Sequence, residues 1–142
     1  MKIGEGEVKK IEYRNNKTIN MKDENKGVLL NKSYNFAVRI VKLSKFLREN
    51  NEYVLSKQVL RSGTAIGALV REGAYAQSAS DFISKLSIAL KEANETDYWI
   101  SLLHDTGYLD KKMKDSFEKE CGELIAILIA SVKTTKKHLS EK

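Results

Sequence analysis

Apolar residues recur at intervals of three and four along four successive segments, and the chain contains no proline that could interrupt them. This spacing places apolar side chains on one face of an α-helix. Proline inside a helix removes a backbone hydrogen bond and introduces a clash, so its absence favours long helices over a loop-rich β protein. The sequence therefore predicts an all-α fold.

The expected helices span about residues 33–49, 56–77, 79–106 and 110–137. Ser33 and Ser56 are expected to open the first two helices, because a serine hydroxyl can accept a hydrogen bond from a first-turn amide. Ser78 and Asp81 form a capping-box pattern at the third helix, and Asp110 is expected to cap the fourth. Since the links are short, neighbouring helices should be antiparallel. The prediction is an up-down-up-down four-helix bundle.

The 142 residues suffice for one domain with a core. We expect a flexible polar tail at residues 1–30 and the bundle domain at residues 31–142. The N-terminal region lacks the apolar segment of a secretory signal, and the longest apolar stretch is far shorter than the roughly 20 residues of a membrane-spanning helix. These features predict a cytoplasmic protein. The single cysteine, Cys121, excludes an internal disulfide and is expected to be a buried, unreactive thiol.

The second expected helix is rich in glycine and alanine. Glycine inside a helix costs about 0.5–1 kcal/mol relative to alanine, so several glycines imply a compensating gain from close helix packing. That packing could lie within the chain or against another copy of it. The small residues are Gly63, Ala65, Gly67, Ala68, Gly73, Ala74 and Ala76.

Arg61 and Glu95 lie at similar distances along the chain from the expected turn near Ala79. In two antiparallel helices such positions face each other. Because an unpaired, partly buried arginine is costly, we expect an Arg61–Glu95 salt bridge, with Asp97 as the alternative partner.

The third expected helix carries apolar residues on two sides. One side faces the core, whereas Ile88, Trp99 and Leu102 lie on the other. An exposed apolar patch of this kind commonly marks an interface. We therefore predict self-association, with Trp99 near the centre of the contact. The alternative is that another part of the same chain covers these residues.

The chain has a net charge of +6, with basic residues on the first expected helix and at the C-terminal end. Clusters of lysine and arginine neutralise phosphates and release counterions when they bind nucleic acid. Such a face is also often simply solvated. The candidate nucleic-acid contacts are Arg39, Lys42, Lys45, Lys133, Lys136 and Lys137.

Motifs that would indicate catalysis are missing from the sequence. Neither His104 nor His138 completes the Glu-x-x-His pattern of di-iron bundles. There is no cysteine pair for zinc, no phosphate-binding glycine loop and no recognisable nucleophile motif. We therefore expect no enzyme activity, no cofactor and no metal site.

The residues of the second and third expected helices resemble those of the four-helix-bundle proteins encoded by ribosomal-RNA intervening sequences. These proteins are related to the accessory variability proteins of diversity-generating retroelements. The resemblance covers about residues 32–137. It is carried by Gln58, Leu60-Arg61-Ser62, Ile66-Gly67, Glu72-Gly73, Asp81-Phe82, Leu86-Ser87-Ile88-Ala89-Leu90, Glu92-Ala93, Glu95-Thr96, Trp99 and Leu102.

This resemblance implies a bundle that assembles into a ring-like homopentamer. The retroelement branch further implies a basic surface that binds nucleic acid and a reverse transcriptase, whereas the intervening-sequence branch implies no established activity. The sequence thus predicts a non-enzymatic, homo-oligomeric scaffold that associates with RNA or DNA. The alternative is a protein-binding assembly module with no nucleic-acid role.

Overall fold

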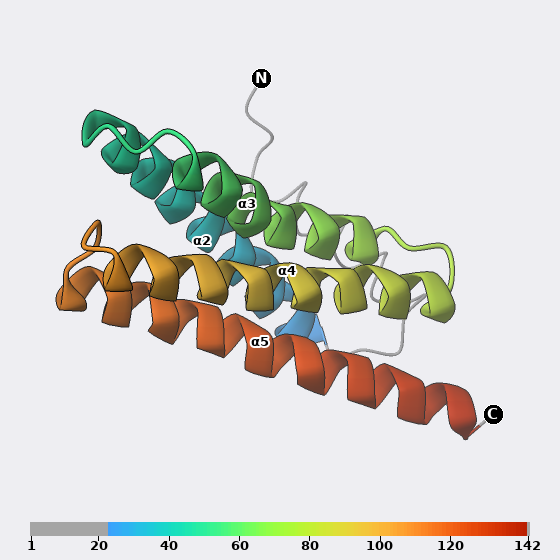
Figure 1. Ribbon diagram of the computed structural model, residues 1–142. Coiled ribbons are helices and arrows are strands. Elements are labelled where there is room, and N and C mark those ends of the chain that lie inside the picture. Colours follow the sequence, from blue (N-terminus) through green and yellow to red (C-terminus); the bar gives the residue numbers. More distant parts are fainter. Residues whose placement is uncertain (1–22, 142) are drawn as a thin grey trace.

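The computed structural model of the protein describes residues 23–141, and all regular structure in that range is helical (Figure 1). The first expected helix begins ten residues earlier than predicted and ends at Glu49 as predicted, and the other three are close to their predicted positions. The four helices are α2 (Asp23–Glu49), α3 (Leu55–Ala74), α4 (Ala79–Asp105) and α5 (Lys111–Ser140).

Each helix packs against two others, in the order α2–α3–α4–α5 and back to α2. The α2–α5 pair is the least closely packed of the four. One apolar core lies between the helices and receives side chains from all of them, as the 3.6-residue period requires. Its largest fully buried members are Phe36, Phe82, Leu29, Ile40, Leu47, Ile66, Leu86, Ile100, Leu103, Leu124 and Leu128.

The predicted start of the first helix was wrong. α2 begins at Asp23, and Ser33 lies buried inside it, where its hydroxyl donates to the carbonyl oxygen of Leu30 rather than capping the helix. Leu29 and Leu30, at the end of the expected tail, are part of the core. The polar composition of residues 23–27 hid this early start, which adds ten residues to the predicted helix. The rest of the expected tail, residues 1–22, lies outside the described residues.

The predicted cap of α3 was also wrong. Ser56 is buried, and its backbone amide donates to Glu52 Oε2 at 2.6 Å. The other oxygen of the same carboxylate accepts from the Val54 amide at 3.2 Å. Glu52 is only 7% exposed. A carboxylate therefore caps α3 from the preceding link, where it also complements the positive end of the helix dipole.

The ends of α4 and α5 agree with the sequence. Ser78 accepts from the Asp81 amide at 3.0 Å, and Asp110 accepts from the Met113 amide at 2.8 Å. Gly107 lies in the link between these helices with a φ of +89°, which favours glycine. Because the link between them is short, α4 and α5 lie side by side along most of their length (Figure 1).

Two of the small residues of α3 allow α2 to approach closely. A Cβ atom at Gly63 would lie 2.7 Å from Ile40, which is fully buried. A Cβ atom at Gly67 would lie 3.1 Å from the carbonyl oxygen of Ser33. Packing within the chain therefore accounts for these two glycines, as one of the two readings of the sequence proposed.

Candidate nucleic-acid interface and assembly face

Arg39 bridges α2 and α5. Its Nη1 donates to Glu120 at 2.7 Å and its Nη2 donates to Ser116 at 2.9 Å. The guanidinium also lies over the ring of Phe117, 4.1 Å from the ring centroid. Glu120 thus compensates the charge of Arg39, and the contacts with α5 fix the orientation of its guanidinium. Arg39 is therefore a poorer phosphate contact than an unpaired cation.

A second ion pair crosses the same boundary. Lys32 Nζ donates to Glu123 Oε2 at 2.7 Å, and this hydrogen bond together with the positive charge of Lys32 holds the pKa of the Glu123 carboxyl below its ordinary value. Between the two ion pairs lies an open cavity of about 460 Å³ that is lined by basic and acidic side chains. Glu120 and Glu123 offset much of its positive charge, so this cavity does not present a simple anion site.

Lys42 and Lys45 differ from Arg39. Both are exposed on α2, one helical turn apart, and neither has a carboxylate partner within residues 23–141. Because helical residues three apart are neighbours, the two ammonium groups form a local cluster of positive charge. Unlike Arg39, these two lysines are available to a phosphate.

The predicted C-terminal contacts lie elsewhere. Lys133, Lys136 and Lys137 are exposed near the end of α5. The start of α5 lies beside the C-terminal part of α2, and α5 runs from there to the opposite end of the bundle (Figure 1). From Met113 to Lys133 the helix extends about 30 Å, at about 1.5 Å per residue. The six predicted residues therefore form two separate groups.

A shallow apolar groove adjoins Lys42. Leu43 and Phe117 form its buried floor, and Phe46 and Met113 form its more exposed walls. The groove has a volume of about 290 Å³, and Arg39 and Lys42 also line it.

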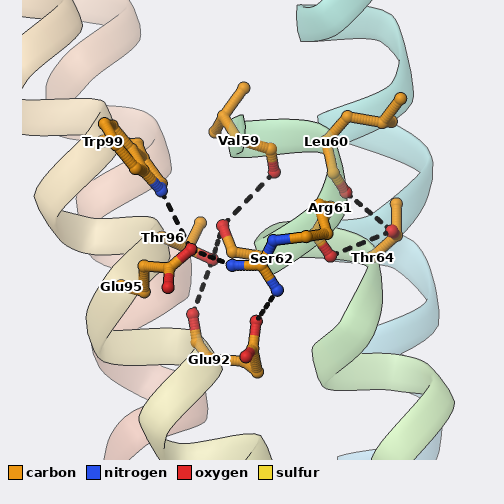
Figure 2. Close-up of polar contacts among 9 residues, drawn as sticks. All are labelled: Val59, Leu60, Arg61, Ser62, Thr64, Glu92, Glu95, Thr96 and Trp99. Atoms are coloured by element: carbon orange, nitrogen blue, oxygen red, sulfur yellow. Dashed lines mark hydrogen bonds and ion pairs between the residues drawn. The ribbon is translucent and has the colours of Figure 1, made fainter. Parts of the chain in front are cut away.

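The expected arginine cluster lies between α3 and α4 (Figure 2). Arg61 Nη1 donates to Glu92 Oε2 at 2.9 Å, and Arg61 Nη2 contacts Glu95 Oε2. Partial desolvation lowers the pKa of Arg61, but the two carboxylates outweigh it and raise that pKa above its ordinary value. Beneath this cluster, Thr96 Oγ1 lies 2.9 Å from the buried Ser62 Oγ.

Asp97, the alternative partner, does not take part in this cluster. Burial raises the pKa of Asp97, the charge of Glu118 acts in the same direction, and Lys114 opposes them. Asp97 therefore faces α5, because two residues along a helix turn a side chain to a different side.

Trp99 extends the arginine cluster toward the surface. Its indole N–H donates to Glu95 Oε2 at 3.0 Å, and Tyr98 packs edge-on against it with ring centroids 5.0 Å apart. The indole is partly buried against the core. Of the predicted interface residues, Ile88 is 41% exposed and Leu102 is partly buried. The face is thus less exposed than the helical period alone suggested, but it is not covered.

The remaining polar chemistry is sparse. Burial, reinforced by the charge of Asp97, raises the pKa of the Cys121 thiol to about 12, and Cys121 Sγ donates to the Ala93 carbonyl oxygen at 3.2 Å. A thiol in this state is a poor nucleophile. Within residues 23–141 no group of His, Cys, Asp and Glu side chains is arranged to hold a metal ion. No helix in that range is both long and apolar enough to cross a membrane.

Sequence reasoning missed the contacts that join α2 to α5. Glu120 and Ser116 bind Arg39, and Met113 and Phe117 complete the groove at Phe46. Met113 and Phe117 belong to the apolar stripe of the expected fourth helix, but the sequence does not show which residues of α2 they or the polar Ser116 and Glu120 meet, because the rotation of α5 against α2 is fixed only by packing. The pairing of Glu92 with Arg61 was also not predicted, although Glu92 lies three residues before Glu95 and so places its carboxylate on the same face of the helix.

Comparison with known proteins places the chain in a family. A comparison with curated proteins found no match. The fold is similar to a crystal structure, at 1.70 Å resolution, of a protein with unknown function from the S23 ribosomal protein family of Bacteroides thetaiotaomicron VPI-5482. The two share 52% sequence identity and a TM-score of 0.76, over 77% of this chain and 98% of that chain. Residues 26–130 match the 23S rRNA-intervening sequence protein family. The chain therefore belongs to that family, in agreement with the resemblance read from its sequence.

Proposed function

We propose that this chain is one subunit of a cytoplasmic, non-enzymatic homopentamer that associates with nucleic acid. Each subunit is an antiparallel up-down-up-down bundle. One face of α4 contacts another copy, and the basic end of α2 contacts phosphates. A reverse transcriptase as a protein partner rests only on the resemblance to the retroelement accessory proteins.

The proposed contact between copies is supported by the surface of α4. Ile88 and Tyr98 are 41% and 57% exposed, and they lie on the same helix as the partly buried Trp99. Aromatic residues are enriched at protein interfaces because a rigid ring buries a large area. Glu95, itself held by Arg61, fixes the indole through a hydrogen bond. The surface is thus ordered before it binds, which lowers the entropic cost of association.

One observation supports nucleic-acid association most directly. Lys42 and Lys45 are adjacent, exposed and without carboxylate partners in residues 23–141, although neighbouring Lys32 and Arg39 are both paired. Positive charge that is left uncompensated at one place suits a polyanion. The name of the family, which refers to a 23S rRNA intervening sequence, agrees with this proposal.

The test is RNA binding measured as a function of salt concentration. Electrostatic binding should weaken steeply as salt rises, and each lost phosphate contact should reduce the logarithmic slope by about one. We expect this reduction for Lys42→Glu and Lys45→Glu. The control is Lys91→Glu, which makes the same charge change at an exposed position on α4. Equal effects of all three variants would show that only net charge matters.

A protein-binding module without a nucleic-acid role is the second candidate. It is favoured by the pairing of Lys32 and Arg39 with α5 carboxylates and by the separation of the two basic groups. In that case RNA binding would be absent at every salt concentration, while the oligomer would remain.

A further inference from the structure

The apolar groove at the end of α2 places an aromatic ring beside the two unpaired lysines. Lys42 and Phe46 are four residues apart on α2 and therefore lie on the same face, about 5–6 Å apart at their Cβ atoms. Lys45 immediately precedes Phe46. Phe46 is 37% exposed, whereas the groove floor, Leu43 and Phe117, is only 3% and 4% exposed.

The groove offers one open ring rather than a continuous apolar surface. Arg39 covers the ring of Phe117 from 4.1 Å, so Phe46 is the aromatic side chain of the groove that remains accessible. The groove volume of about 290 Å³ is just below the roughly 300–1,000 Å³ of typical ligand sites. A small planar group fits this space better than the apolar face of a helix does.

We infer that the groove takes an unpaired base of a single-stranded nucleic acid, stacked on Phe46, with adjoining phosphates on Lys42 and Lys45. A ring next to a strip of positive charge is how proteins bind single strands without reading their sequence. In a duplex the base faces are already stacked on each other and cannot reach the ring. The inference rests on the proposed nucleic-acid association and narrows its ligand to unpaired strands.

The experiment compares a labelled RNA strand of about 12 nucleotides with the same strand annealed to its complement, by fluorescence anisotropy at low salt. We expect tighter binding of the single strand. Phe46→Leu keeps an apolar side chain and removes the ring, so it should weaken single-strand binding about 5-fold or more without changing the salt slope. The control is Tyr75→Leu, which removes a 53% exposed ring at the end of α3.

A second variant reports on stacking without removing the ring. The wild-type protein has a single tryptophan, Trp99. In the Phe46→Trp variant a base stacked at this position should quench fluorescence beyond any change seen in the wild-type protein. Quenching by the single strand and not by the duplex supports the inference.

Three results would overturn it, and they differ in their meaning. Equal binding of both RNAs, unchanged by Phe46→Leu, would remove the stacking site and leave the proposed function standing. No binding of either RNA would remove both. A change in particle mass in Phe46→Leu, without a change in RNA affinity, would show that the groove is a contact between copies.

Discussion

Replacing Gly63 with alanine tests the packing of α2 against α3. Alanine is the better helix former, and the exchange should stabilise an unconstrained helix by about 0.5–1 kcal/mol. At Gly63, however, the new Cβ would lie 2.7 Å and 2.8 Å from two carbons of Ile40, a side chain with no exposed surface. Overpacking of this kind costs about 1–3 kcal/mol. The net expectation is a destabilisation of about 1–2 kcal/mol.

The assay is urea denaturation followed by circular dichroism, at one fixed protein concentration because assembly also contributes to apparent stability. Gly122→Ala is the matched control. Gly122 lies within α5, and a Cβ there would meet nothing within 4 Å. This variant should be more stable than the wild type by about 0.5–1 kcal/mol.

A double-mutant cycle identifies the atoms responsible. In an Ile40→Ala background the space beside Gly63 is free, so Gly63→Ala should become neutral or stabilising. Stabilisation by Gly63→Ala in the wild-type background, similar to that of Gly122→Ala, would refute the close packing described for α2 and α3.

Three further predictions concern a cap, an ion pair and the thiol. Glu52→Ala should lower the free energy of unfolding by about 1–2 kcal/mol, because the Val54 and Ser56 amides lose their acceptor; an unchanged urea midpoint would contradict the cap. Lys32→Met should raise the pKa of Glu123 toward its ordinary value in an NMR titration. Since the pKa of Glu123 is lowered in the folded state, its contribution to stability is present above about pH 4.3 and is lost as the pH falls through the folded value, and this loss should shrink in Lys32→Met. Cys121, with a pKa of about 12, should react with a thiol reagent at about pH 8 only after unfolding in urea, and prompt labelling of the folded protein would contradict its burial.

Much of the fold could be predicted from the sequence because it depends on local rules. The apolar period of α4 and α5 and their Ser78 and Asp110 caps are set by residues within one or two turns. The start of α2 could not be found in this way. Its first residues are polar, and what buries Leu29 and Leu30 is contact with the rest of the bundle. Similarly, nothing near Glu52 in the sequence indicates that its carboxylate turns back onto the Ser56 amide.

The candidate site was only partly predictable, for a related reason. Arg61 and the acidic residues of α4 could be matched by counting from one short link. Arg39 and Glu120 are 81 positions apart, on the first and last described helices, so no count from a single link relates them. The sequence therefore identified the basic residues but not which of them other side chains neutralise. That distinction, which favours Lys42 over Arg39, came from the packing of α5 on α2.

The mass of the particle in solution tests the central claim most directly. Light scattering of the purified chain should give five subunits of 16.1 kDa each. Ile88→Glu should break this assembly by placing charge in the contact. Ile129→Glu is the control, because Ile129 is 42% exposed but lies on α5. A wild-type particle of one subunit, or equal masses for both variants and the wild type, would contradict the assembly through α4.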